Sequence, residues 1–577
     1  MSPSRSWWRW HAEPAPPPPA PPQAPALPPH GVRHVAHDIP SRAAPGLVVP
    51  VRLVLENTGS LTWRSSSPAG DFVGLAVHWD GRVVANHMMP RPEVRPGESV
   101  TLRFALEFPM EPGPHRLDLK MVQYQVAVFE DRGVPPLTIG VTIEDAPPDD
   151  DARCWDAMQR LGPWHYLPTR GIARGRDGSS YPVFVKRAQG AHVFDLSNRR
   201  YVDYTMGWGT VLLGHAHPKV SEALRAMLDT GPTVSLPQPI EFDVAERLVE
   251  DFHPGGMICF AKNGSDACTF AARMARVLSG RQTILFSGYH GWQDFWVEQV
   301  GFGRTGVPPR EPQRIFRFPF HDLAEFRRLL ALHRADLAAV MIEPSPWAGD
   351  GLGFEPDTDP AFLKAVETET RGAGALFILD EIVTGYRYPE RSVARAKGVS
   401  PDLTCLGKAI ASGLPLSAVV GRADVFKLAL PRSYYAATFH AESYSFAAAK
   451  AAIDVYRSEP VAAHVWDYGR RLEDGVLARA REQGVETEVW GPPFRMSVRL
   501  PRADRVLWQL ERTLLQQELL RNGIVTNNGV MLPSFAHDDA TLAATMEAFG
   551  RAFEVVARTA RRGDWDEALE IPPLIDL

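Results

Sequence analysis

Residues 256–278 read GMICFAKNGSDACTFAARMARVL, and this stretch indicates the fold class of most of the chain. The apolar run MICFA predicts a strand, and the spacing of apolar residues after the NGS turn predicts a helix. Strand-like runs return in LAAVMIEPS, residues 337–345, and in ALFILDEIVTG, residues 375–385. Strands that alternate with helices indicate an α/β fold around a largely parallel sheet.

The turn in this stretch is a candidate phosphate site. Gly264, Ser265 and Asp266 follow the predicted strand and open the predicted helix. Free backbone N–H groups at such a helix N-terminus can cradle a phosphate, and the Ser265 hydroxyl could add a donor. The alternative is an ordinary helix cap by serine or aspartate.

Two charged residues stand in otherwise apolar or small surroundings. Lys408 lies between LTCL and AIASG, where burial would lower the pKa of its amine and favour the neutral form that Schiff-base chemistry requires. Asp380 ends the apolar run ALFILD, at the strand end where open α/β sheets bind ligands. The structural alternatives are a lysine at a helix end and an aspartate at a helix start.

Four segments in this order resemble the class III aminotransferases, which use pyridoxal 5'-phosphate (PLP). They are NGSDA, GYHGW, LDEIVTGYR and DLTCLGKAIASGLP. Within the family they are most similar to the glutamate-1-semialdehyde 2,1-aminomutase branch, and the similarity runs from about Gly190 to Ala548. The resemblance implies a fold-type I PLP-dependent transferase with a large domain and a small C-terminal lobe.

The resemblance also implies a role for each matched residue. Lys408 would carry the cofactor as a Schiff base and move the reaction's proton, and Asp380 would hold the pyridinium nitrogen. The remaining implied cofactor contacts are Gly264, Ser265 and Asp266 at the phosphate, Tyr289 with His290 beside it on one face of the ring, Ile382 on the other face, and Thr438 at the phosphate of the neighbouring subunit. Active sites shared in this way imply at least a homodimer.

The residues that would choose the substrate depart from the aminomutase pattern. In TRGIARGRDGSSYP, residues 169–182, Arg170 and Ala173 stand where the branch has the serine and arginine of its N-S-x-V-R motif. Arg170 or Arg174 could still bind an anion, or the loop is simply solvated. Trp208 in MGWGT would line the entrance through which substrate reaches the active site. The alternative is that Trp208 is a buried tryptophan of the core. The glutamate of the F-E-A-G stretch is absent, and EPSPWAGDG from Glu343 is altered.

These departures favour transamination, between a small-molecule amino donor and a carbonyl acceptor, over the aminomutase (isomerase) reaction. Both reactions share the chemistry of the cofactor, and the protein decides what enters and leaves. A scaffold with an inert PLP fold and a carbohydrate-binding protein with a subsidiary enzyme domain remain as alternatives.

The N-terminal quarter has a different pattern. Residues 31–145 contain short alternating runs between Pro/Gly turns, which predict an antiparallel β-sandwich. ENTGSLTW, RPGESVTL and MEPGPHRLDLKMVQ resemble Ig-like domains attached to bacterial polysaccharide-related proteins. We interpret this domain as a binding or assembly module with a glycan or protein as its candidate ligand, and a purely structural role is the alternative. The same resemblance suggests an amino-sugar or cell-surface polysaccharide substrate for the enzyme. Residues 1–30 are expected to be a disordered Pro-rich tail, 146–160 a linker, and 161–577 the aminotransferase-like domain.

Composition excludes several classes of function. The chain has 577 residues, 45% hydrophobic and 23% charged, with a net charge of -6, so neither nucleic acid nor a membrane surface is an expected partner. No apolar stretch approaches the length of a membrane span. Four cysteines without a CxxC pair argue against a metal site or disulfide framework and favour a cytoplasmic location. Cys405 is interpreted as a packing residue.

Overall fold

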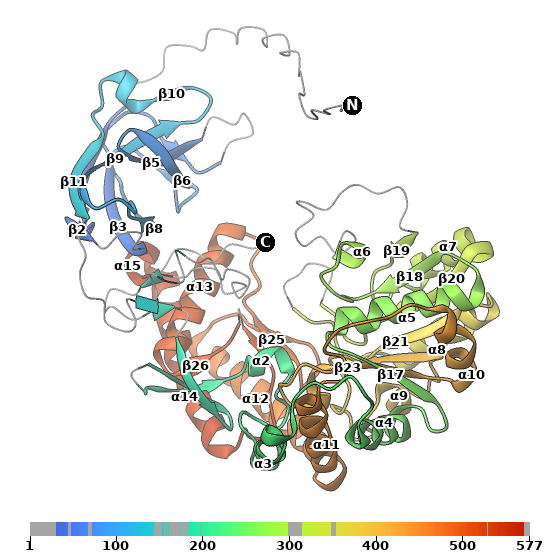
Figure 1. Ribbon diagram of the computed structural model, residues 1–577. Coiled ribbons are helices and arrows are strands. Elements are labelled where there is room, and N and C mark those ends of the chain that lie inside the picture. The colour runs from blue at the N-terminus through green and yellow to red at the C-terminus, as the bar shows by residue number, and fades with distance from the viewer. Residues whose placement is uncertain are drawn as a thin grey trace, which may run out of the picture. The chain divides into compact units, whose positions relative to one another are not determined.

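The computed structural model describes residues 30–43, 48–66, 72–143, 173–174, 180–181, 184–196, 198–297, 314–347, 353–527 and 529–570, with residues 153, 154, 157 and 160. The chain divides into two compact units. The first takes residues 1–42, 52–102 and 113–142, and the second takes residues 43–51, 103–112 and 143–577. Figure 1 labels many of the elements of both units.

Antiparallel sheets build the N-terminal β-rich region. One sheet has the order β1 (Val32–His37), β3 (Val48–Asn57), β8 (Ser99–Glu107). The other has the order β2 (Arg42–Ala43), β11 (Leu137–Ile143), β9 (Gly113–Gln123), β5 (Val73–Trp79), β6 (Arg82–Met88), with β10 (Ala127–Val128) beside β9. β1 pairs antiparallel with β3, and β5 pairs antiparallel with β6 and β9. The predicted β-sandwich-like region is thereby confirmed.

The NTG-x-x-W segment shows why the sequence folds in this way. Residues 51–57 of β3 alternate between buried and half-buried positions, as one covered face of a sheet requires. Buried Asn57 donates from its amide to the carbonyls of Leu61 and Val94, at 2.7 and 3.0 Å. Trp63, at the start of β4 (Trp63–Arg64), is fully buried beside the strand β7 (Glu93–Val94). These two bonds of Asn57 fix the turn that places Trp63 in the core.

The flanking segments are only partly described. Residues 1–29 of the expected tail lie outside the described residues, whereas His30 is buried and its Nε2 lies 3.2 Å from Oε1 of Gln123. The tail expectation therefore needs correction at His30, which belongs to the β-rich region. Most of the expected linker, 146–160, also lies outside the described residues, so the domain boundaries stay predictions.

A seven-stranded sheet forms the centre of the large lobe of the second unit, residues 205–458. Its order is β17 (Met257–Ala261), β23 (Ser417–Gly421), β22 (Leu403–Leu406), β21 (Leu376–Asp380), β20 (Leu337–Ile342), β18 (Thr283–Ser287), β19 (Ile315–Arg317). The five strands from β22 to β19 pair in parallel, and β23 runs antiparallel to β17 and β22. The expected α/β fold around a largely parallel sheet is confirmed.

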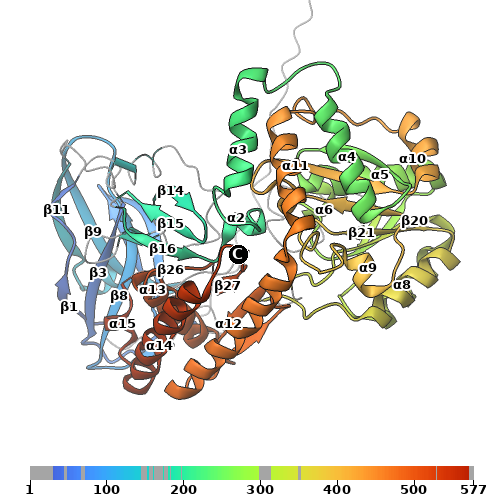
Figure 2. The same ribbon diagram turned by 90° about the horizontal axis from the view of Figure 1, so that it is seen from below.

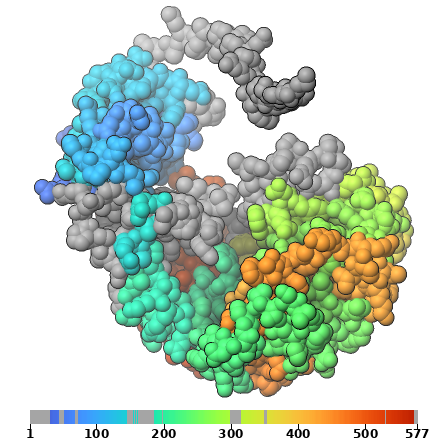
Figure 3. Space-filling view, viewed as in Figure 1, coloured from blue at the N-terminus to red at the C-terminus, as the bar shows by residue number. Residues whose placement is uncertain are grey.

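Helices cover both faces of this sheet, so its strands are apolar on both sides. Along β20, Val340 and Ile342 join one buried cluster, and Ala339 and Met341 join the other. The first cluster includes residues of α3 (Pro218–Met227), α4 (Pro239–Phe252), α7 (Leu323–His333), α8 (Pro360–Gly372) and α11 (Ser443–Ser458). The second includes residues of α5 (Gly264–Ser279) and α10 (Ala423–Ala429). The orange atoms of α11 meet the green atoms of α3 and α4 on the surface seen in Figure 3.

A small lobe is built from residues 184–204 and 461–570, two segments far apart in the sequence (Figure 2). The strands β14 (Val185–Gln189), β15 (His192–Asp195) and β16 (Arg200–Asp203) form a sheet that β26 (Ile524–Val525) joins in parallel. A second sheet contains β24 (Glu488–Trp490), β25 (Met496–Arg499) and β27 (Val530–Met531). The helices of this lobe are α12 (Val461–Gln483), α13 (Arg505–Arg521), α14 (Asp539–Arg562) and α15 (Trp565–Ala568).

Short elements complete the described chain. The short helical turns are η1 (Phe129–Arg132), α2 (Met206–Gly209), η3 (Leu228–Thr230), α6 (Asp294–Val297), η4 (Arg334–Asp336), α9 (Val393–Lys397), η5 (Lys408–Ala411) and η6 (Leu430–Arg432). The pair β12 (Ala173–Arg174) and β13 (Ser180–Tyr181) is antiparallel. Within the described ranges, none of the helices combines the length and apolar composition that crossing a bilayer requires.

Two helical glycines make a test of the small lobe's packing. A Cβ at Gly469 in α12 would lie 2.0 Å from the backbone oxygen of Pro493, whereas a Cβ at Gly550 in α14 would meet only Arg479, at 3.6 Å. We expect Gly469→Ala to lower the free energy of unfolding by about 1–3 kcal/mol through overpacking. Gly550→Ala should raise it by about 0.5–1 kcal/mol, because alanine favours a helix. Denaturant unfolding measures both, and equal effects would contradict the packing.

Candidate active site

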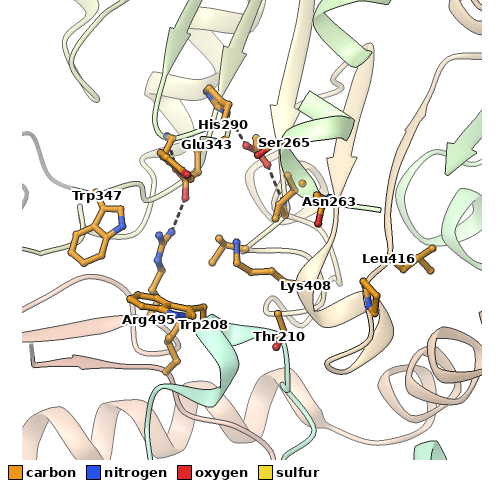
Figure 4. Close-up of a pocket in the computed structure, with 18 of the residues that line it drawn as sticks. Trp208, Thr210, Asn263, Ser265, His290, Glu343, Trp347, Lys408, Leu416 and Arg495 are labelled. Carbon is orange, nitrogen blue, oxygen red and sulfur yellow. Dashed lines mark hydrogen bonds and ion pairs between the residues drawn. The ribbon is translucent and has the colours of Figure 1, made fainter. Parts of the chain in front are cut away.

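A cavity of about 620 Å³ lies where the parallel strands of the large lobe end. Asp380 ends β21, Lys408 follows β22 and Glu343 follows β20, and all three line the cavity. Arg495 and Leu532 of the small lobe line it as well. The place is the one expected for ligand binding in an open α/β sheet, and Figure 4 shows the side chains that line it.

Lys408 reaches this cavity from a strained turn. Its φ of 47° lies in the left-handed region, and Ser412 and Gly413 that follow have φ of 44° and 100°. Such backbone strain is characteristic of functional sites. Burial lowers the pKa of the Lys408 amine, and the positive charge of Arg495 lowers it further, against the opposite effect of Glu343 and Asp380. A neutral amine at this position can act as a nucleophile.

Asp380 is a buried carboxylate with donors from three segments. Oδ2 accepts from Nδ1 of His290 at 2.7 Å and from the Cys268 thiol at 3.3 Å, and Oδ1 accepts from the Ile382 backbone at 3.1 Å. His290 is also buried, and its Nε2 has no partner among the described residues. Asp380, His290 and Ile382 all line the cavity.

The start of α5 forms one end of the cavity. Gly264 and Ser265 line it, and their backbone N–H groups and the Ser265 hydroxyl donate to no acceptor within the described residues. A Cβ at Gly264 would lie 2.7 Å from Cδ1 of Ile382, and one at Gly291 would lie 2.2 Å from Oγ of Ser265. Because both positions are glycine, the turn after β18 and the segment of Ile382 can approach the start of α5 closely. The donors at this start have no acceptor within the described residues. This is the donor set that a phosphate requires.

The expected phosphate contact by Asp266 needs correction. Its carboxylate accepts the Asn263 backbone N–H at 3.1 Å and the Gln293 amide at 3.3 Å. Its own N–H donates to the carbonyl of Asn263. Because these groups are used locally and Asp266 does not line the cavity, it stabilises the turn. Asn263, which sequence analysis passed over, is the neighbour that lines the cavity.

Trp208 lies at the cavity in an unusual backbone conformation. Met206, Gly207, Trp208 and Gly209 all have positive φ, between 45° and 78°, so α2 is a left-handed turn. The Trp208 side chain is 42% exposed and lines the cavity, so the alternative of a core tryptophan is wrong. The buried guanidinium of Arg387 donates to the carbonyl of Gly209 and holds the end of this turn.

Other predicted residues are placed as follows. Tyr289 lines the cavity, and its backbone N–H donates to Oε2 of Glu343 at 2.9 Å. Thr438 lies in an exposed turn before α11 and does not line the cavity of its own chain. Arg170 lies outside the described residues, and only the backbone of Arg174, in β12, is described.

Sequence analysis missed a buried ion pair in the cavity wall. Nη1 of Arg495 lies 2.8 Å from Oε1 of Glu343, and a dashed line marks this contact in Figure 4. Arg495 stands in the loop GPPFRMS between β24 and β25, where a single arginine gives no recognisable motif. Cys405 is buried in the sheet, and burial raises the pKa of its thiol, in agreement with a packing role.

The residues of the cavity fit PLP. The cofactor carries an aldehyde, a ring nitrogen and a phosphate. Lys408 offers an amine, Asp380 a buried carboxylate, and the start of α5 a set of free donors. The partnerless Nε2 of buried His290 is a further polar group that a ligand could satisfy.

Comparison with known proteins agrees with this geometry. Residues 173–553 match the family model Aminotransferase class-III. The chain is 34% identical over 321 residues to the glutamate-1-semialdehyde 2,1-aminomutase of Heliobacterium modesticaldum, a match that covers 54% of this chain and 72% of that protein.

Solved structures show the same fold. The FumI protein of Sphingopyxis sp. MTA144, in a PLP form, aligns with a TM-score of 0.61 and 26% identity over 66% of this chain and 90% of that one. An omega-transaminase from Sphaerobacter thermophilus aligns with a TM-score of 0.58 and 28% identity, covering 66% and 92% of the two chains. The expected fold-type I architecture is confirmed.

Proposed function

Because the chain belongs to the class-III aminotransferase family and is a PLP-dependent enzyme, we propose that it transfers an amino group from a small-molecule donor to a carbonyl acceptor. The observation that carries the proposal is the cavity shared by Lys408, Asp380 and the free donors at Gly264 and Ser265. The family membership and this cavity support an enzyme over the alternative of an inert scaffold.

Each cavity residue of the chain has its own role toward the cofactor. PLP supplies an aldehyde that condenses with amines and a ring that accepts electrons from the bond broken next to the amine. Lys408 would hold the cofactor and move the proton, because burial lowers the pKa of its amine and so favours the neutral form. Asp380 would keep the ring nitrogen protonated. His290, 2.7 Å away, orients that carboxylate.

A second candidate is the 2,1-aminomutase reaction, which the name of the Heliobacterium modesticaldum relative favours. An aminotransferase releases one product and accepts a second substrate, whereas an aminomutase returns the amino group to the same molecule. The loss of the N-S-x-V-R pattern at Arg170 and Ala173 supports transamination.

Several finer expectations stay proposals. We propose a glycan or protein ligand for the β-rich region and an amino-sugar or cell-surface polysaccharide substrate for the enzyme, both from the Ig-like resemblance alone. The carbohydrate-binding alternative rests on the same resemblance. A cytoplasmic location is supported by four unpaired cysteines, Cys154, Cys259, Cys268 and Cys405.

The transfer itself is tested with a labelled donor. We expect ¹⁵N from a labelled amino acid to appear in a different carbonyl compound supplied as acceptor, and borohydride reduction to leave a pyridoxyl mass on the Lys408 peptide. Lys408→Ala should do neither. If glutamate-1-semialdehyde alone is converted to its 2,1-isomer and no label reaches a different carbonyl acceptor, the aminomutase reaction is the correct one.

Asp380→Asn tests the role of the buried carboxylate. We expect bound PLP but a loss of turnover of about a hundredfold or more, because a neutral amide cannot keep the ring nitrogen protonated. Asp402→Asn is the matched control: Asp402 is equally buried, at the opposite end of the strands, and accepts the Phe377 N–H at 2.8 Å. That variant should lose thermal stability with turnover per folded enzyme retained. Turnover within about threefold of wild type in Asp380→Asn rejects the role.

We also propose a homodimer with shared sites. Thr438 is exposed and away from its own cavity, as a residue that serves a partner would be. Large apolar side chains of the same lobe are also exposed, as a protein interface would require: Leu228, Val234, Leu236, Phe242, Tyr434 and Phe439.

Subunit mixing tests this arrangement. Thr438→Ala should weaken PLP affinity by about tenfold or more, through loss of a charge-assisted hydrogen bond. When Lys408→Ala chains exchange with Thr438→Ala chains at limiting PLP, activity should rise above both parents, because one site of each heterodimer then carries neither change. Absence of recovery, or a strictly monomeric protein, contradicts the shared site.

A further inference from the structure

The hydrogen bonds to the Asp380 carboxylate are divided unequally between its two oxygens. Oδ2 accepts from Nδ1 of His290, at 2.7 Å, and from the thiol of Cys268, at 3.3 Å. Oδ1 accepts one bond, from the Ile382 backbone N–H at 3.1 Å. Each carboxylate oxygen can accept about two such bonds. Within the described residues, Oδ2 is therefore fully used, whereas Oδ1 can still accept from a further donor.

The helix α5 brings the Cys268 thiol to this carboxylate. Cys268 follows Gly264 by four residues, so both stand on the same face of α5, and Gly264 lines the cavity. Cys268, His290 and Asp380 are all buried, and the atoms through which they could bind lie within 4.8 Å of one another. One face of α5 therefore provides the free donors at the start of the helix and, one turn later, a donor to Asp380.

The Cys268 thiol keeps its proton and so acts as a donor. Burial raises the pKa of this thiol well above its usual range, and the neighbouring Cys405 thiol and the negative charge of Asp380 raise it further. A thiol is a weak donor, but a hydrogen bond to a charged oxygen is stronger than one between neutral groups. The contact of Cys268 with Oδ2 therefore stabilises the ionised form of Asp380.

The donors on Oδ2 bear on where a shared proton resides. A proton between a carboxylate and a pyridine nitrogen can belong to the nitrogen, beside an ionised carboxylate, or to the carboxyl group, beside a neutral ring. Hydrogen bonds to the carboxylate favour its ionised form and so favour the proton on the nitrogen. The protonated ring is the form that accepts electrons. Each donor to Oδ2 thus supports the form of the ring that amino transfer requires.

We propose that Cys268 is a positioning residue for the cofactor: with His290, its thiol occupies Oδ2 of Asp380, so that Oδ1 binds the ring nitrogen and the proton stays on the ring. The competing explanation is that Cys268 only fills space in the buried cluster between α5 and the sheet. The proposal rests on the proposed function, because it concerns the partner of the ring nitrogen in the same site.

The ring nitrogen itself reports where the proton lies. We expect the enzyme loaded with PLP that carries ¹⁵N in its ring to show the chemical shift of a protonated pyridine. Cys268→Val removes the donor and keeps a side chain of similar size. It should move this shift toward the value of a neutral pyridine and lower turnover about threefold to tenfold, as the loss of one hydrogen bond would. Cys268→Ser, which restores a donor, should return the shift to the wild-type value. If Cys268→Val has the wild-type shift, the proposal is wrong.

Cys405→Val is the matched control. Cys405 lies in β22 next to Cys268, in the same buried cluster, and the described residues show no hydrogen bond from its thiol to Asp380. Cys405→Val should therefore leave the ¹⁵N shift unchanged, although it removes a thiol from the same core. An equal change of the shift in both valine variants, without recovery in Cys268→Ser, shows that packing alone sets the shift and overturns the proposal.

The infrared S–H stretch tests the contact in the unchanged chain. The Cys268 band, identified by its loss in Cys268→Ser, should lie at lower frequency than the band of Cys259, whose sulfur is 3.8 Å from the carbonyl oxygen of Phe260. The charged acceptor makes the stronger bond, so Asp380→Asn should raise the frequency of the Cys268 band. A Cys268 band that Asp380→Asn leaves in place contradicts the proposal.

The same spectra separate this proposal from the proposed function. If the ring nitrogen is neutral in the wild type, the role proposed for Asp380 fails, and the role of Cys268 fails with it. If the ring is protonated in the wild type and equally protonated in Cys268→Val, the proposal for Cys268 fails although amino transfer through Asp380 stands.

Discussion

The active site depends on the carboxylate of Asp380, which lies out of water at the end of β21. A buried charge is tolerated only where donors satisfy it, and here they come from three places: His290 after β18, Cys268 in α5 and the Ile382 backbone. These bonds tie the turn after β18 and the helix α5 to the central strand. The same contacts position Ile382 and Gly264 at the cavity wall. An arrangement that satisfies one carboxylate thus also assembles the place where we propose that PLP binds.

Close approach of backbones is the second requirement of the site. Gly264, Gly288 and Gly291 each stand where a Cβ would lie 2.7 Å or less from a neighbouring side chain. Non-glycine residues also adopt left-handed conformations here, Lys408 at 47° and Trp208 at 59°. Such conformations cost about 1–3 kcal/mol each and persist where surrounding contacts hold them. Around Trp208, the buried Arg387 supplies one of those contacts.

The large lobe and the small lobe contribute different chemical groups to the cavity. Residues after the strands of the large lobe provide the amine of Lys408, the carboxylate of Asp380 and the donors that we propose for the phosphate. Arg495, with Val530 and Leu532, comes from the small lobe. A division of this kind lets substrate preference change while the chemistry of the cofactor is kept, because the protein's side chains and not PLP decide what enters. The ion pair of Arg495 with Glu343 stands where the two contributions meet.

The sequence by itself determined the α/β fold, the position of Lys408 after one strand and of Asp380 at the end of another, and the start of α5, because apolar periodicity and turn residues are local signals. It also predicted the alternating pattern of the segment that forms β3. It could not show that Asp266 turns back to cap its own helix, nor that Arg495 meets Glu343 across 152 positions of chain. Those contacts were decided by the tertiary structure, because a charged side chain gains its role from the partners that distant segments bring to it, and no local pattern records which partners those are.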